Sequence, residues 1–300
     1  MQLIDQSMYI CRRKGCHHIT PKIMHFTIFS SIVILVLINL VGGISFEQDV
    51  SLNLEQKKLL DQFKARVIDR LPHDYMKREI YLIKWLRSNN YNLDRAEDAL
   101  YRNLRWRKEQ KMDTIHSEDW SDMWDNDYRY YIDGRDKMGR PFLFLELKHF
   151  DARKLIVQGK GERMLRYFSK AWDEGCNLIQ ELGAKYGNMT RGNVVFDLDG
   201  FNAVQHVCIQ CIPYMIRNVV DFVQHFPECL DKMIYVKSPQ IMEQVLTLTK
   251  PLLPAEYGNS TFVYGTNKEV WMAGLREDFD LDQLPPGLGG TKLYKGMEYR

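Results

Sequence analysis

The sequence predicts an α/β fold, in which a mainly parallel sheet with flanking helices follows a small helical subdomain and an N-terminal membrane helix. Three observations support this prediction. Short apolar strand patterns alternate with helical patterns between residues 141 and 264, amphipathic helical patterns precede them, and an uncharged apolar run lies near the N-terminus. Strands that alternate with helices favour parallel pairing with right-handed crossovers.

The apolar run extends from Phe26 to Val41, and Gly42–Phe46 continues it to about the 20 residues that span a bilayer. Basic residues precede the run and acidic residues follow it, namely Arg12, Arg13, Lys14 and Lys22 before it and Glu47, Asp49 and Glu55 after it. Because positive charge stays on the cytosolic side, we expect a signal anchor with the globular part in the lumen.

Two alternatives to this topology remain open. The run is short and is followed by small residues such as Gly43 and Ser45, a pattern that a cleaved signal peptide of a secreted protein also shows. A globular part that faces the cytosol is the other alternative.

The overall composition excludes few functions. The net charge of +2, from 41 basic and 39 acidic residues, gives no field that favours nucleic acid. The chain has six cysteines in 300 residues, too few for a scaffold held together by disulfides, and their spacing does not reveal a pairing. We therefore expect an ordinary globular protein with a large core.

The segment after the apolar run predicts helices. Apolar residues recur at helical spacing around residues 59–68, 80–86 and 96–107, and Asn89-Asn90 marks a turn between the second and third helices.

Four strands and three longer helices are expected further along the chain. The strands are Pro141–Leu147, Asn193–Leu198, Met233–Lys237 and Thr261–Tyr264, and Tyr130–Ile132 is placed to form a hairpin with the first. The helices cover residues 162–185, 204–226 with an interruption near Pro213, and 241–253.

Five short motifs occur in a characteristic order. They are Gly134–Pro141, Asp197–Phe201, Phe226–Glu228, Lys250–Leu253 and Leu284–Gly290. Together they resemble the CRAL-TRIO lipid-binding family, which includes phosphatidylinositol and phosphatidylcholine transfer proteins, and the resemblance covers about residues 54–290. It implies an N-terminal helical subdomain at 47–112 and a lipid-binding domain at 113–292. The apolar run and its flanking charges add a basic tail at 1–25 and a membrane segment at 26–46, and a tail at 293–300 follows the domain.

The resemblance implies a protein without enzymatic activity or cofactor that binds or transfers a phospholipid or other hydrophobic ligand at a membrane. The helix from Gln240 to Leu253 would then act as a gate over an apolar pocket, although a helix that only packs on the core would show the same pattern. Candidate ligand-binding residues are Phe142, Phe144, Phe168, Trp172, Phe196, Met215, Phe222, Glu228, Met242, Val245 and Leu246. The alternative function is a membrane-anchored interaction adaptor that keeps the fold without a transferable ligand.

The resemblance also argues against phosphoinositide recognition. The positions that carry the headgroup contacts in phosphoinositide-binding members fall here on Asn89, Asn90, Glu228, Cys229 and Ser260, so only the glutamate is kept. A phosphate needs cations to offset its desolvation. We therefore expect a neutral or zwitterionic lipid.

Catalytic and metal-binding motifs are weak in this sequence. It contains no Gly-x-Ser-x-Gly, His-Glu-x-x-His or Gly-Lys-Ser/Thr motif. His206, Cys208 and Cys211 do not complete a tetrahedral zinc site, so we expect Cys208 and Cys211 to be buried thiols. Asp197 and Asp199 are expected to form a structural turn.

The predicted topology can be tested through its sequons, Asn188-Met-Thr190 and Asn259-Ser-Thr261. A globular part in the secretory lumen should be glycosylated, above all at Asn188, which is expected in a surface loop. Endoglycosidase treatment of the chain expressed in cells should then increase its mobility, and the shift should shrink in Asn188→Gln. A chain without a shift that is digested by protease added outside intact microsomes faces the cytosol.

Overall fold

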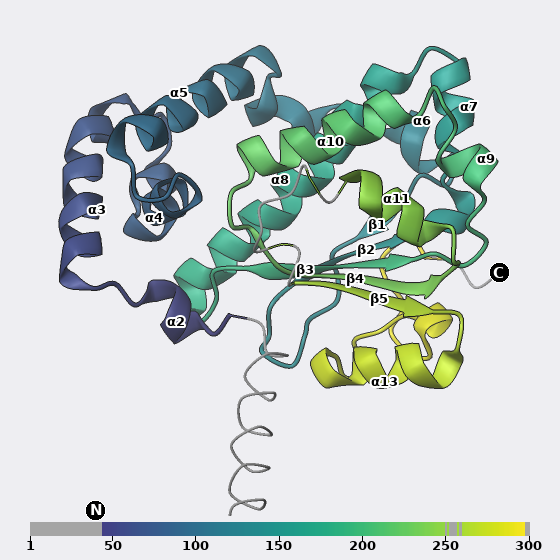
Figure 1. Ribbon diagram of the computed structural model, residues 1–300. Coiled ribbons are helices and arrows are strands. Elements are labelled where there is room, and N and C mark those ends of the chain that lie inside the picture. The colour runs from purple at the N-terminus through teal and green to yellow at the C-terminus, as the bar shows by residue number, and fades with distance from the viewer. Residues whose placement is uncertain (1–43, 250, 252–256, 258–259, 298–300) are drawn as a thin grey trace, which may run out of the picture. The chain divides into compact units, whose positions relative to one another are not determined.

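The structure is a computed structural model, which describes residues 44–249, 251, 257 and 260–297 (Figure 1). The description concerns the compact unit that begins at Ile44. The expected membrane run at 26–43, Cys11, Cys16 and the sequon residue Asn259 lie outside the described residues. Within them, no helix is long and apolar enough to cross a membrane.

Four helices open the described chain. They are α2 (Phe46–Val50), α3 (Leu54–Val67), α4 (Glu79–Ser88) and α5 (Leu93–Glu109). Ser45 with Gln48 and Asn53 with Gln56 form capping boxes, which satisfy the free N–H groups at the first turns of α2 and α3. Apolar stripes of α3, α4 and α5 meet in one buried cluster that includes Phe63, Leu82 and Leu100. The three expected helices are confirmed.

The sheet has five strands in the order β1-β2-β3-β4-β5. They are β1 (Tyr130–Tyr131), β2 (Phe142–Glu146), β3 (Gly192–Asp197), β4 (Leu230–Ser238) and β5 (Thr261–Gly265). β1 pairs with β2 in antiparallel orientation, and the other neighbours pair in parallel. The expected hairpin and the mainly parallel sheet are therefore confirmed.

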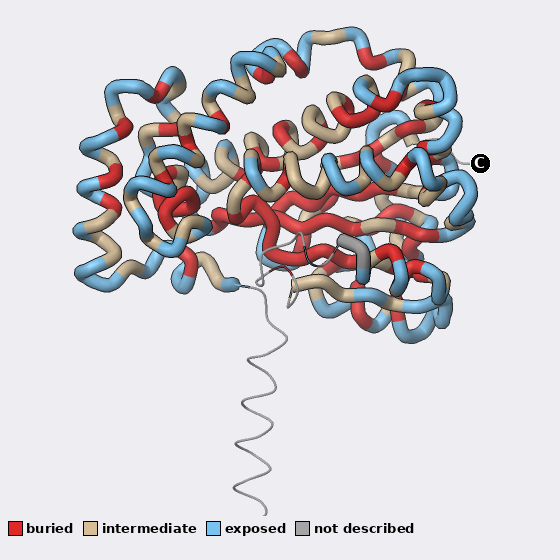
Figure 2. Tube along the Cα trace, turned by 45° about the horizontal axis from the view of Figure 1, so that its top comes forward, coloured by how far each residue is buried: buried red, intermediate tan, exposed pale blue. Residues whose placement is uncertain are grey.

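Helices cover both faces of the sheet (Figure 1). One face carries α8 (Gly161–Tyr186), α10 (Ile212–His225) and α11 (Met242–Thr249), and α13 (Lys268–Asp278) covers the other. Short helices complete the fold, namely α6 (Ser121–Trp124), α7 (Ala152–Val157) and α9 (Ala203–His206). The strands between these layers form the most continuously buried part of the chain (Figure 2).

Two sequence expectations need correction. Pro213 does not interrupt a helix but lies in the first turn of α10, where its missing N–H costs no helical hydrogen bond. Cys208 and Cys211 are not free thiols but form a disulfide, because a tight turn brings their Cα atoms to 4.9 Å. α11 covers only the first part of the helix expected at 241–253, and residues 250 and 252–253 lie outside the described residues.

A second disulfide joins Cys176 in α8 to Cys229 just before β4, with Cα atoms 5.8 Å apart. The bond links α8 directly to the sheet. All four cysteines of the described part are therefore paired, which the sparse spacing did not predict.

The two disulfides should contribute differently to stability, because Cys176–Cys229 spans 53 positions of sequence and Cys208–Cys211 only 3. Loop-closure entropy predicts about 4 kcal/mol for the long loop and about 2 kcal/mol for the short one. Urea unfolding of the double variants Cys176→Ala/Cys229→Ala and Cys208→Ala/Cys211→Ala should show this order. Equal losses would contradict it.

Candidate functional site

Most of the predicted ligand-binding residues lie on the sheet face under α8, α10 and α11. Phe196 of β3, Met215 of α10 and Leu246 of α11 pack against a buried group formed by Leu198, Met242 and Val245. Phe168, Trp172 and Phe222 belong to the adjoining core on the same face. Phe196 and Tyr235 contact both groups, so the two are continuous.

Six of these side chains leave apolar surface accessible in the interior of the fold. Phe196 lies on the central strand, where its neighbours Val194 and Val195 are fully buried, yet Phe196 itself is only half-buried. The half-buried residues are Phe168, Trp172, Phe196, Met215, Tyr235 and Leu246. We call them the apolar cluster. Close packing would bury such side chains completely, so this face keeps apolar surface that its neighbours do not cover.

Aromatic contacts order the apolar cluster. The rings of Phe196 and Tyr235 stack with centroids 4.7 Å apart, and Trp172 lies 4.7 Å from Phe222. Burial raises the pKa of Tyr235 to about 12, so its phenol is neutral at physiological pH. The cluster therefore offers uncharged aromatic surface.

Phe142 and Phe144 do not join the apolar cluster. Alternation along β2 directs both side chains to the other face of the sheet, where they are fully buried against α13 residues such as Leu275. The sheet thus separates them from Phe196, and the predicted set does not form a single site.

Helix α11 packs closely on this face. Met242 and Val245 are buried against Leu198, whereas Ile241 is exposed just before the helix. α11 therefore lies over β3 and β4 residues of the apolar cluster (Figure 1), and its role as a gate stays a prediction.

Glu228, the remaining headgroup position, lies in a buried ion-pair network away from solvent. Its Oε2 lies 2.7 Å from Arg87 Nη2 and 3.1 Å from Arg191 Nη2, and both arginines also bind Asp49 at 2.8–2.9 Å. Burial raises the pKa of Glu228, although the two arginines act against this. Burial would also raise the pKa of Asp49, but its contacts with Arg191 and Arg87 lower it overall.

The other headgroup positions carry no cation. Asn89 donates from its side chain to the carbonyl of Trp85 at 2.9 Å, and Cys229 is held in its disulfide. Ser260 and Asn90 are uncharged. Arg87 and Arg191 are nearby cations, but their contacts with Asp49 and Glu228 neutralise them.

Sequence reasoning missed this network. Asp49, Arg87, Arg191 and Glu228 come from four distant segments, and no local motif connects them. Only the fold brings them together.

The weak metal and catalytic candidates have structural roles. His206 contacts the Leu147 carbonyl through Nε2 at 2.7 Å, and the described residues contain no group of three or more His, Cys, Asp or Glu side chains arranged to hold a metal. Asp197 accepts from the Asp199 backbone N–H at 3.0 Å and pairs with Lys237 at 2.7 Å. The predicted structural turn at Asp197 is confirmed.

Comparison with known proteins identifies the domain. A family model described as the CRAL/TRIO domain matches residues 125–290. Protein real-time of Anopheles gambiae is 25% identical over 223 residues, covering 70% of this chain and 31% of that protein. A CRAL-TRIO domain-containing protein of Caenorhabditis elegans is 23% identical over 252 residues, covering 80% of this chain and 33% of that protein. Protein real-time of Aedes aegypti is 22% identical over 251 residues, covering 81% of this chain and 38% of that protein.

The chain thus spans about a third of the length of the curated relatives it matches. The crystal structure of Sfh5 has the same fold, with a TM-score of 0.58 at 14% identity, over 72% of this chain and 82% of that one. From the sequence alone, residues 262–270 and 284–290 also resemble the CRAL-TRIO part of motile sperm domain-containing protein 2, and this finer resemblance stays a prediction.

The neutralised headgroup positions predict that phosphoinositides do not strengthen binding to vesicles. Affinity for phosphatidylcholine liposomes should stay within about twofold when phosphatidylinositol phosphates are added, because no unpaired cation occupies these positions. Flotation assays measure this. As a matched comparison, Asn89→Arg/Asn90→Lys should introduce a response, and a tenfold increase with the unmodified chain would contradict the prediction.

Proposed function

Because the chain belongs to the CRAL/TRIO domain family, whose members generally bind lipophilic ligands, we propose that it binds a neutral or zwitterionic lipid on the apolar cluster beneath α11. The observation that carries this proposal is the accessible apolar surface of Phe196 and its neighbours on the central strands. The ligand would cover this surface, and each buried methylene contributes about 0.8 kcal/mol.

In this proposal α11 is the element that moves. Met242 and Val245 face Leu198, so a shift of α11 away from the sheet would open the apolar cluster without breaking any strand pairing. A helix of eight residues that contributes few core side chains is an element of low local stability, as gating requires.

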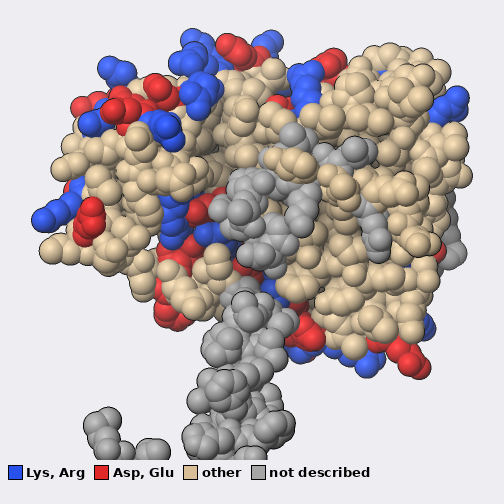
Figure 3. Space-filling model, viewed as in Figure 1, with Lys and Arg blue, Asp and Glu red and all other residues tan. Residues whose placement is uncertain are grey.

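The surface near α11 supports exchange of the ligand at a membrane. Val204, Ile209 and Ile241 are exposed beside the beginnings of the helices that border the apolar cluster. On this face of the molecule, charged side chains gather over α3 to α5, whereas the area over α10 and α11 carries few (Figure 3). An uncharged surface with exposed apolar side chains favours contact with lipid.

The disulfides favour an oxidising compartment as the location of the globular part. Both pairs of the described cysteines are oxidised, and such bonds persist in the secretory pathway and outside the cell. Asn188 is exposed just after α8, accessible to a glycan. These features favour the lumenal or secreted arrangement inferred from the N-terminal charges.

A charge placed on the inner face of α11 tests ligand binding. Val245→Asp would put an unpaired carboxylate against the apolar cluster and should reduce lipid uptake from liposomes at least tenfold. The matched control is Ile241→Asp, at a side chain that is 40% exposed compared with 6% for Val245. Mass spectrometry of co-purified lipid provides the readout, and circular dichroism verifies folding.

An absence of bound lipid would contradict the proposal. If the chain is expressed in eukaryotic cells, carries no lipid and takes none up from liposomes, the proposal is wrong and the interaction adaptor is favoured.

A further inference from the structure

A cleft separate from the apolar cluster lies between α4 and α8. It has a volume of about 200 Å³, with Tyr81 and Trp85 of α4 on one side and Ile179 and Gln180 of α8 on the other. Its lining includes none of the residues of the apolar cluster. The cleft is therefore a separate feature, which the proposed function does not use.

The lining is mostly apolar and rich in aromatic rings. Phe46, Tyr75, Tyr81, Trp85 and Phe226 all contribute to it. Such surface takes up the hydrophobic body of a ligand. A volume below the roughly 300–1,000 Å³ of sites for drug-sized ligands limits the ligand to a small molecule, well short of a diacyl phospholipid.

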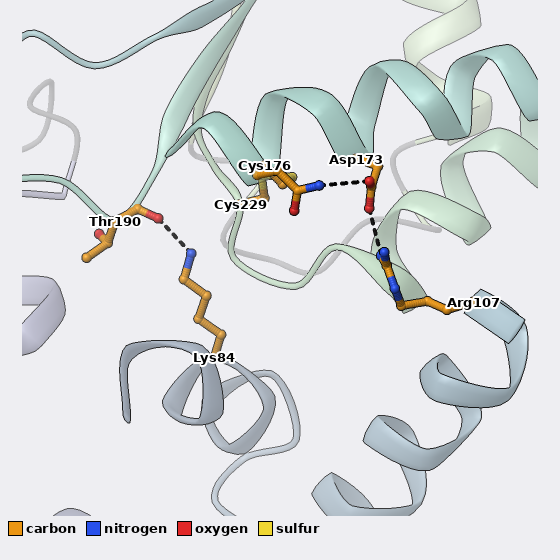
Figure 4. The surroundings of a disulfide bond; sticks show 7 residues. Lys84, Arg107, Asp173, Cys176, Thr190 and Cys229 are labelled. Carbon is orange, nitrogen blue, oxygen red and sulfur yellow. Dashed lines mark hydrogen bonds and ion pairs between the residues drawn. A yellow bond between two sulfur atoms is a disulfide. The ribbon is translucent and has the colours of Figure 1, made fainter. Parts of the chain in front are cut away.

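Lys84 provides one charged group of the cleft. It enters from α4 and is 9% exposed, and its Nζ donates to the Thr190 carbonyl at 2.6 Å (Figure 4). No carboxylate oxygen among the described residues lies within 4.0 Å of this Nζ. An ammonium has three N–H donors, so two remain for another acceptor.

Charge counting around Lys84 reveals an excess of positive charge. The buried network holds three cations and two carboxylates, namely Lys84, Arg87 and Arg191 with Asp49 and Glu228. Both arginines pair with both carboxylates, whereas Lys84 has neither carboxylate within ion-pair distance and interacts with them only at longer range. Burial and the charge of Arg191 lower the pKa of Lys84 to about 8, although Asp49 and Glu228 act against this, and the amine is still mostly protonated at neutral pH.

Arg107, another cation of the cleft, differs from Lys84 because it pairs with a carboxylate. It points from α5 toward α8 and pairs with Asp173 at 2.7 Å (Figure 4). Its charge is thus already balanced within the protein, and Arg78, which also lines the cleft, is exposed to solvent. Lys84 is therefore the buried cation of the cleft that has no carboxylate of the described residues in contact with it. A buried cation without a carboxylate in contact with it destabilises the folded protein, and a bound anion would reduce this free-energy cost.

We propose that this cleft binds a small amphipathic carboxylate, with its carboxylate on Lys84 Nζ and its hydrophobic body against Tyr81, Trp85 and Phe226. A single buried ammonium with two free donors matches one carboxylate. The site goes beyond the proposed lipid function and does not depend on it.

Calorimetric titration of the chain with octanoate tests the proposal, with 1-octanol as the uncharged probe of equal length. Octanoate should bind, and octanol should bind at least tenfold more weakly. Lys84→Met removes the ammonium at nearly constant volume and should weaken octanoate binding at least tenfold. Loss of an unpaired buried charge should leave the fold intact. Lys154→Met, at an exposed lysine of α7, is the matched control and should not change binding.

A second variant blocks the cleft sterically without removing the Lys84 charge. It also distinguishes binding in the cleft from binding at the apolar cluster. Ala184→Phe, at an exposed position on the rim of the cleft, should block octanoate while liposome lipid uptake stays unchanged. Octanoate binding that survives Lys84→Met, matches that of octanol, or is abolished by Val245→Asp instead would overturn the proposal. In the last case the probe occupies the apolar cluster, and the proposed lipid function would still stand.

Discussion

The buried ion pairs among Asp49, Arg87, Arg191 and Glu228 join the helical segment to the sheet domain. Asp49 belongs to α2 and Arg87 to α4, whereas Arg191 precedes β3 and Glu228 precedes β4. Removal of one member of such a network leaves a buried charge unpaired, which costs about 3–5 kcal/mol. The orientation of α4 and α5 against α8, and therefore the cleft between them, depends on these contacts.

The same network gives the one retained headgroup residue, Glu228, an internal role. Glu228 has a positive φ of 50°, a strained backbone conformation that its buried contacts help to hold. Its carboxylate is balanced by arginines from inside the protein, and the adjacent Cys229 ties this turn to α8. The one retained headgroup position is thus part of an internal structural link.

The sheet then divides the apolar residues into two groups with different roles. On the α13 face, Phe144 and Val195 are fully buried and belong to an ordinary core. On the face under α10 and α11, Phe196 and Tyr235 keep accessible surface. A close-packed core on one face gives the sheet rigidity, which the lipid site that we propose on the other face would require.

Local patterns in the sequence determined most of the secondary structure, because helix and strand periodicity depends only on neighbouring residues. They identified α8, the hairpin of β1 and β2, the parallel strands and the family motifs from Gly134 to Gly290. They also identified Phe196, Met215, Met242, Val245 and Leu246, which the structure brings together. Only the tertiary structure decided that Phe142 and Phe144 face away, that the cysteines pair as 176–229 and 208–211, and that Lys84 is buried without a carboxylate of the described residues in contact with it. Strand orientation, disulfide pairing and buried ion pairs depend on contacts between residues far apart in the chain, and no local pattern contains that information.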